Sequence, residues 1–348
     1  MKDEIKISDR KREILFNAVE SYIENASPIT SEKVQSSLFT NLSSATLRNE
    51  LNALEQMGYL KQLHTSSGRV PTTKAYRFYV DNLLNNNTFD EKIINEIKDK
   101  FVVRSTFLSD VLNDIAKSIN EITNFPTYVK IKGYKNLVVH GINVIPLITG
   151  QGLVLFQTSA GIINSTVNLS SDVTEDICKD ASKYLTTNLY GKTIADIMQN
   201  IDYYNNLFTT QIKFYQELFV SLTNVIKKFA EEKTSKLIHT NTTKLLNEPE
   251  YKDINRAKKF LSLIEDETEI KEIIENIDNN ATNELVFTIG DENLNQNYSD
   301  YSIINANYNI GNGVVASVSV LGPERMDYAK IASALKYISD EIKKYSKE

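Results

Sequence analysis

Hydrophobic positions recur at helical spacing in three successive stretches near the start of the chain. The first begins at Ser8 or Asp9 and runs to about Glu24, the second covers Ser31–Leu38, and the third begins at Ser43 or Ser44 and ends at Met57. Thr30 can cap the second helix, and Gly58 follows the third, where a left-handed residue is favoured. Because residues 41–44 form a polar turn, the predicted order is helix, helix, turn, helix.

Two short strands and a fourth helix follow these three helices. Residues 59–65 and 69–71 are typical strand segments, and the intervening Ser66-Ser67-Gly68 predicts a hairpin with Gly68 at a position that needs a positive φ. Thr72 or Thr73 can then cap a helix that runs to Leu84. The polar run of residues 85–87 is typical of a linker, so the sequence predicts a first domain over residues 1–85.

The rest of the chain alternates between strand and helix patterns. Residues 86–124 predict a helical connector, with apolar positions at helical spacing from 89 to 122. Strands are predicted at 127–133, 137–148, 152–157, 161–169, 285–289, 302–308 and 313–321. Further helices are predicted at 172–189, 202–238, 251–277 and 324–344.

The two groups of strands can complete one antiparallel sheet if the helical stretch between them is an insertion. On that reading, residues 125–190 and 282–348 form one domain and residues 191–281 form an inserted domain. The fold class is therefore expected to be multidomain α+β, in line with a length of 348 residues.

The third helix has an apolar and a polar face. Leu47, Leu51 and Leu54 lie within about 60° of one another around the axis and are predicted to pack on the first two helices. The polar face and the N-terminal end carry side chains suited to DNA. Arg can bind guanine and Asn adenine through two hydrogen bonds, and small residues let the helix approach the groove. The predicted DNA-reading residues of this helix are Ser44, Thr46, Arg48, Asn49 and Asn52.

The distribution of charge supports a contact with DNA in only one stretch of the chain. The formal net charge of the chain is -6, yet residues 56–80 contain no acidic residue. The side chains predicted to contact phosphates or the minor groove there are Lys61, His64, Ser67, Arg69, Lys74 and Arg77. A solvated polar helix face is common in proteins without DNA, but a polar-faced third helix followed by a basic hairpin favours a winged helix-turn-helix.

Other classes of function find little support in the sequence. No stretch approaches the roughly 20 apolar residues of a membrane span, and the charged N-terminal residues do not resemble an export signal, so a cytoplasmic protein is expected. Cys178 is the only cysteine and is expected to be a small buried side chain. With three histidines and no ligand spacing, neither a metal nor a cofactor is expected. No catalytic motif is present, so the chain is predicted not to be an enzyme.

Several segments together resemble the family of the heat-inducible transcription repressor HrcA. They are residues 44–51 (SATLRNEL), 54–60 (LEQMGYL), 64–72 (HTSSGRVPT), 76–80 (YRFYV), 241–250 (NTTKLLNEPE) and 320–330 (VLGPERMDYAK). This resemblance implies a winged helix, a GAF-like domain and an inserted dimerisation domain. It also implies a repressor of chaperone genes that binds an inverted-repeat operator on double-stranded DNA as a homodimer, is released on heat stress and is assisted by a GroEL-type chaperonin.

A second class of function stays open at this point. A GAF-like domain could bind a small metabolite, with the winged helix as its output. The sequence does not identify a pocket for such a ligand.

Overall fold

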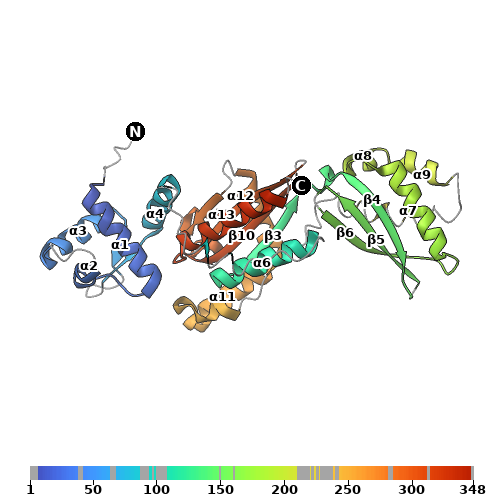
Figure 1. The fold of residues 1–348 in the computed structure, drawn as a ribbon. Helices are drawn as coiled ribbons and strands as arrows, with labels where there is room; N and C mark the ends of the chain where they lie inside the picture. Colours follow the sequence, from blue (N-terminus) through green and yellow to red (C-terminus); the bar gives the residue numbers. More distant parts are fainter. Residues whose placement is uncertain are drawn as a thin grey trace.

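The structure is a computed structural model that describes residues 7–37, 42–62, 68–86, 94–95, 98, 108–148, 150–159, 161–209, 220, 223–224, 227, 238–239, 243–280, 285–311 and 314–345. The chain has a mixed α+β fold with antiparallel sheets. Figure 1 shows three parts in a row: the N-terminal helices at one end, a central sheet flanked by helices, and a smaller sheet at the other end. Among the helices of the described residues, none has the length and apolar character needed to cross a membrane.

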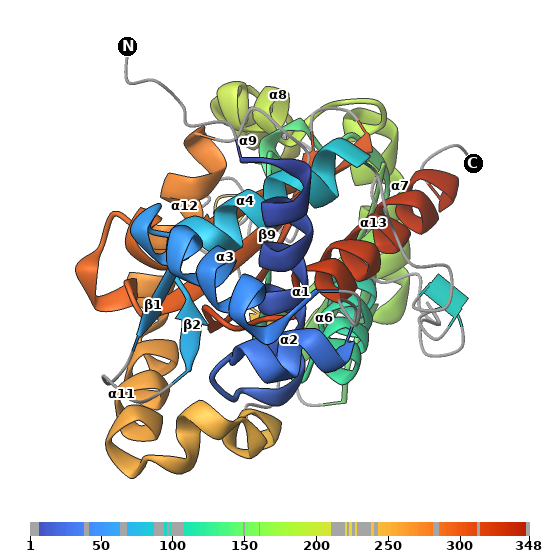
Figure 2. The same cartoon turned by 90° about the vertical axis from the view of Figure 1, so that its left-hand side faces the viewer.

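The N-terminal part contains the helices and hairpin expected from the sequence. Its elements are α1 (Asp9–Asn25), α2 (Ser31–Ser37), α3 (Ser44–Gln56), β1 (Leu60–Gln62), β2 (Arg69–Pro71) and α4 (Thr73–Asn86). Ser8 and Ser43 cap α1 and α3 by accepting bonds from the Lys11 and Thr46 amides, which otherwise lack partners at a helix start. Figure 2 views the molecule from this end, with the helices and the hairpin facing the reader.

The hairpin is held by a third chain segment that the sequence pattern did not reveal. Ile29 forms an antiparallel bridge with Arg69, with backbone N···O distances of 2.7 and 2.9 Å in the two directions. A Cβ on Gly68 would lie 2.6 Å from the Ile29 carbonyl oxygen. Gly68 is not among the glycines with positive φ, so the prediction for its backbone was wrong. Glycine is required there because the backbone of residue 29 passes too close for a side chain.

The central sheet has five strands in the order β7-β3-β10-β9-β8. These strands are β3 (Thr127–Lys132), β7 (Ile238–His239), β8 (Leu285–Ile289), β9 (Tyr301–Gly311) and β10 (Val314–Pro323). The long pairing of β9 with β10 forms a hairpin, and β3 pairs along the other side of β10. The sheet therefore joins segments from both halves of the chain.

Helices cover both faces of this sheet: α6 (Leu108–Thr123), α11 (Ile254–Glu265), α12 (Glu267–Asn280) and α13 (Tyr328–Tyr345). The Tyr308 hydroxyl donates to the Leu335 carbonyl on α13 at 2.7 Å, whereas the Tyr301 ring packs 4.9 Å from the Phe260 ring on α11. Alternate residues of a strand point to opposite faces, so α13 and α11 lie on opposite sides. Figure 2 shows α11 well apart from α6 and α13.

The single helix predicted over residues 251–277 is two helices. The Asp266 side chain accepts hydrogen bonds from the Thr268 and Glu269 amides, at 3.1 and 3.0 Å, and so caps α12 where α11 ends. Apolar spacing continues across this break, which is why periodicity alone suggested one helix. Ahead of α11 stand two short 3-10 turns, η2 (Thr243–Asn247) and η3 (Pro249–Lys252).

The third part is a separate three-stranded sheet, β4 (Val139–Pro146), β5 (Gln151–Thr158) and β6 (Gly161–Asn168), with α7 (Glu175–Leu189), α8 (Ile194–Gln199) and α9 (Ile201–Thr209). Cys178 on α7 is buried, as expected. Hydroxyls of α7 reach the backbone of the outer strand: the Val144 amide donates to Ser182 Oγ at 2.8 Å, and the Ile142 amide donates to Thr186 Oγ1 at 2.9 Å. These bonds occupy backbone donors on an edge that could otherwise pair with another strand.

The expectation that all the strands form one sheet was wrong. β3 pairs with β10 on one side and, at Tyr128 and Val129, with β7 on the other, whereas β4 pairs with β5 in a separate sheet. β4, β5 and β6 therefore lie outside the sheet that contains β3 and the strands of residues 285–323, while α11 and α12 of the expected insertion pack with the central part. α9 covers the start of the helix predicted over residues 202–238. Most of the remaining range lies outside the described residues.

Candidate nucleic-acid interface

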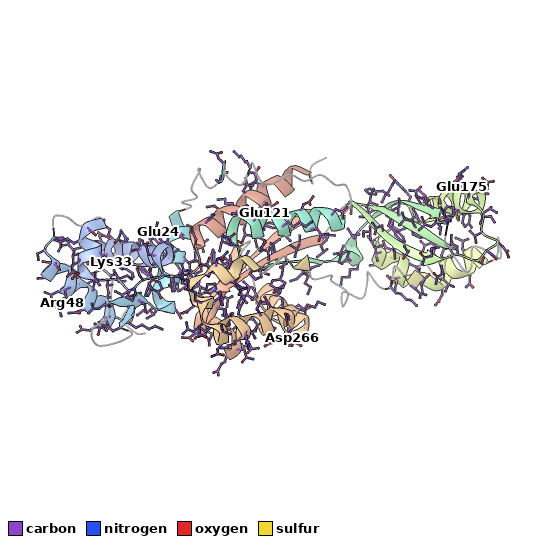
Figure 3. The ribbon with its side chains drawn as sticks, turned by 90° about the horizontal axis from the view of Figure 1, so that it is seen from below. Glu24, Lys33, Arg48, Glu121, Glu175 and Asp266 are labelled. Atoms are coloured by element: carbon purple, nitrogen blue, oxygen red, sulfur yellow. The ribbon has the colours of Figure 1, made fainter. Side chains whose placement is uncertain are left out.

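The outer end of the N-terminal part carries the polar face of α3. Leu47, Leu51 and Leu54 are completely buried beneath it, as predicted from their spacing. Arg48 and Asn49 are exposed on the opposite side, and in Figure 3 Arg48 lies at the end of the molecule farthest from the small sheet. The apolar face thus fixes the helix while the Arg48 guanidinium remains accessible to a large partner.

The first turn of α3 is tied to its surroundings by short hydroxyl contacts. Ser44 Oγ donates to Ser31 Oγ on α2 at 3.1 Å, and the Thr46 hydroxyl lies 2.8 Å from the Ser43 hydroxyl. Both residues are partly exposed. The helix start is therefore positioned against α2 and still presents small side chains.

Two of the residues predicted to contact DNA bind each other. The Arg69 guanidinium on β2 donates to the Asn52 carboxamide oxygen on α3, and its Nε lies 2.8 Å from Glu55 Oε2. Only 11% of the Arg69 side chain is exposed. This contact ties the hairpin to α3, so Asn52 and Arg69 are engaged within the module.

The remaining predicted basic residues occupy different places. Lys61 is exposed on β1, and the exposed Lys74 places its ammonium 2.8 Å from the Met57 carbonyl and over the Tyr59 ring. Arg77 on α4 faces the central part, where its Nε donates to Glu292 Oε1 at 2.7 Å. His64 and Ser67 lie outside the described residues.

Comparison with known proteins identifies the family. The profile described as HrcA protein C terminal domain matches residues 109–332. The heat-inducible transcription repressor HrcA of Acetivibrio thermocellus is 31% identical over 97% of this chain and 96% of its own length. That of Ruminiclostridium cellulolyticum is 30% identical with the same coverage. The chain belongs to the HrcA family. The resemblance found in the sequence is thereby confirmed.

A solved structure shares the fold over nearly the whole chain. It is titled "Crystal structure of a hypothetical protein at 2.2 A resolution" and aligns with a TM-score of 0.72 at 19% identity, covering 98% of this chain and 99% of that one. The HrcA profile begins at α6, so the full-length HrcA relatives are what extend the family match over the N-terminal module.

Two of the HrcA-like segments meet at the junction between the N-terminal module and the central part. Arg325, just after β10, is only 8% exposed, and its guanidinium binds Glu250 and Glu248 at 2.6 Å each. The same group donates to the Ile23 carbonyl near the end of α1. This one side chain joins three segments that are far apart in the sequence, and no local pattern in the sequence marks it. The only signal for it was the family resemblance of residues 241–250 and 320–330.

The residue before Arg325 makes a second contact across the junction. The Thr73 hydroxyl on α4 lies 2.5 Å from Glu324 Oε1. A Cβ on Gly290 would lie 1.9 Å from that same carboxylate oxygen, so glycine is needed for this close approach. Burial raises the pKa of Glu324 above its usual value, and the hydrogen bond from Thr73 and the charge of Lys61 only partly oppose this.

The pKa of Glu324 predicts how stability depends on pH. Because its folded-state pKa is raised, the folded protein holds this proton more tightly than the unfolded chain. The charged carboxylate therefore costs stability at neutral pH, and the cost disappears as the pH falls through the raised pKa to its usual value of 4.5. We expect Glu324→Gln to melt at a higher temperature than the wild type at pH 7 to about 8, with the difference shrinking toward pH 4.5.

Melting curves followed by circular dichroism across this pH range would measure the difference. Glu265→Gln, at an exposed position ending α11, is the matched control and should follow the wild type throughout. A constant difference between Glu324→Gln and wild type at every pH would contradict the assigned role of the carboxyl proton.

Proposed function

We propose that this protein represses transcription of heat-shock chaperone genes by binding an inverted-repeat operator as a homodimer in the cytoplasm. The observation that carries the proposal is α3, anchored by three buried leucines and presenting Arg48 and Asn49 outward at one end of the molecule. The names of the HrcA relatives, which describe heat-inducible repressors, support the regulated process.

In this proposal residues 1–85 act as a winged helix-turn-helix and the five-stranded sheet belongs to a GAF-like domain. Arg48 and Asn49 read base edges in the major groove, with Ser44 and Thr46 at the end of α3 that enters it. Lys61, His64, Ser67 and Lys74 contact phosphates or the minor groove. Asn52 and Arg69 hold the hairpin on α3, and Arg77 anchors α4 to the central part, so these three position the module.

Substitution of Arg48 tests the base-reading role. Arg48→Ala and Arg48→Lys should each weaken binding to a duplex carrying the family's inverted repeat by roughly 1 to 3 kcal/mol per subunit. Alanine removes the charge and the donors, whereas lysine keeps the charge but loses the rigid planar fork that matches a guanine edge. Binding to a scrambled duplex of equal composition should change much less with Arg48→Lys. Fluorescence anisotropy titrations at several salt concentrations would give both affinities.

Lys61→Ala serves as the matched control for this test. Loss of a phosphate contact should weaken binding to both duplexes about equally and lower the salt dependence. If Arg48→Lys weakened both duplexes to the same extent, Arg48 would not read bases.

The third part of the molecule is the proposed dimerisation unit. Among the described residues, five of the nine exposed large hydrophobic side chains lie within residues 139–209, namely Ile145, Leu147, Ile148, Tyr190 and Tyr203. Exposed apolar groups that gather in one region favour a protein contact over a solvated surface. We place the inserted domain at 139–209 because its strands form their own sheet.

A charged substitution at the tip of β4 and β5 tests this assignment. Ile148 is fully exposed in the single chain, so Ile148→Asp should leave the fold intact but move the protein from dimer toward monomer in sedimentation velocity runs. Ile254→Asp changes a residue that is 69% exposed on α11, outside this unit, and should leave the dimer unchanged. A dimer as tight as wild type in Ile148→Asp would place the contact elsewhere.

Release on heat stress and assistance by a chaperonin complete the proposed mechanism. Purified protein that has been heated and cooled should recover its operator affinity only when a GroEL-type chaperonin and ATP are added. The measurement is the fraction of binding-competent protein before heating, after cooling, and after chaperonin treatment. Full recovery without chaperonin would remove this step, and chaperonin without ATP is the control for simple protection from aggregation.

A further inference from the structure

A cavity of about 480 Å³ opens between α12 and the segment that follows β8. Among the described residues that line it are three carboxylates, Glu269 and Glu272 from α12 and Glu292 from η4 (Gly290–Glu292), and no basic residue. Ile273 and Ile277 of α12 provide apolar walls. Its volume lies in the range of natural small-molecule pockets, roughly 300 to 1,000 Å³.

One wall of the cavity contains a polar group without a partner. Tyr298, in the short turn η5 (Gln296–Tyr298), is completely buried and lines the cavity, and its hydroxyl has no hydrogen-bond partner among the described residues. Burial, and then the negative charge of Glu269, raise the pKa of this phenol. A buried hydroxyl left unpaired destabilises a fold, so its presence beside a cavity indicates a site that a ligand completes.

The wall around Tyr298 is already fixed without a ligand. The Asn293 carboxamide nitrogen donates to the carbonyls of Gly290, Tyr298 and Tyr301 at 2.8 to 2.9 Å. Asn295 donates to Glu269 Oε1 at 2.6 Å and holds that carboxylate toward the turn. The site is preformed, which lowers the cost of binding.

The chemistry of the lining selects the class of ligand. Carboxylate oxygens accept hydrogen bonds, and the unpaired Tyr298 oxygen can accept one as well. Within the described residues, no three acidic, histidine or cysteine side chains gather closely enough to hold a metal ion. We infer that this cavity binds a small organic cation, an amine or amidine with an apolar body that rests against Ile273 and Ile277.

The site touches the junction with the N-terminal module through one shared side chain. Glu292 lines the cavity and binds Arg77 of α4, whose guanidinium also donates to the Phe287 carbonyl at 2.7 Å. A bound cation competes with Arg77 for the Glu292 carboxylate. An effect of the ligand on operator binding therefore rests on the proposed function, whereas binding itself does not.

Binding is tested on the full-length protein in the absence of DNA. Phenethylamine and benzamidine are the cationic probes, and 3-phenylpropanoate is the anion with the same ring and chain. A ligand that binds only the folded state raises the melting temperature in a saturable way. We expect this with at least one cationic probe and no rise with the anion, with affinities measured by isothermal titration calorimetry.

Two substitutions connect the binding to the cavity. Glu272→Gln should weaken probe binding by roughly tenfold, the loss of one charge-assisted hydrogen bond. Tyr298→Phe removes only the unpaired hydroxyl, so it should keep or raise the melting temperature of the free protein while reducing the shift caused by the probe. Glu265→Gln, outside the cavity, is the matched control and should bind like wild type.

Three results would overturn the inference. They are no saturable shift with either cation, an equal shift with the anion, or unchanged probe affinity in both Glu272→Gln and Tyr298→Phe. Operator binding is measured separately, so a protein that fails to bind the operator can still satisfy the thermal test.

Discussion

The buried guanidinium of Arg325 joins the N-terminal module to the rest of the molecule through three chain segments. It reaches Glu248 and Glu250 ahead of α11 and the Ile23 carbonyl at the end of α1. Removing an arginine from water is costly, and here two carboxylates and a carbonyl compensate for that cost. Loss of Arg325 would leave the carboxylates of Glu248 and Glu250 without this partner at the junction. The junction is therefore stable only when the arginine and both carboxylates are present.

The neighbouring contacts make the boundary a defined surface. Tyr76 of α4 packs 5.7 Å from Tyr328, whose hydroxyl lies 2.9 Å from that of Ser302 in the central sheet. Thr73 and Arg77 on the same helix reach Glu324 and Glu292. One face of α4 thus packs against the central part. The helix that ends the N-terminal module is also the helix that fixes its orientation.

Local chemistry in the sequence was enough to predict the N-terminal module. The cap at Ser43, the spacing of Leu47 and Leu51, and the glycine after α3 act within a few residues of one another, and each appears in the structure. The roles of Arg69 and Arg77 could not be predicted, because their partners are fixed by tertiary packing. Both look like free surface cations in the sequence but are engaged with Glu55 and Glu292.

The sheet assignment was wrong for a related reason. The strand patterns identify β3 and β4 correctly, but they do not show which strand edges are already paired with another strand. The two-residue strand β7 is too short to detect by alternation, yet it takes the free edge of β3. The break at Asp266 within an uninterrupted apolar pattern was likewise decided by a cap.

The position of the small sheet in the chain has a consequence for the order in which the molecule assembles. The chain leaves the central sheet at the end of β3 and returns to it at β7. Because β7 pairs with β3, the residues between them are one long insertion whose two ends are adjacent. Closing a longer loop costs little, only about 0.6 kcal/mol for each doubling of its length. The central sheet can therefore form before the insertion has folded. On warming, the insertion can lose its structure while the central sheet stays folded. The two sheets would then unfold at separate temperatures, as two cooperative units.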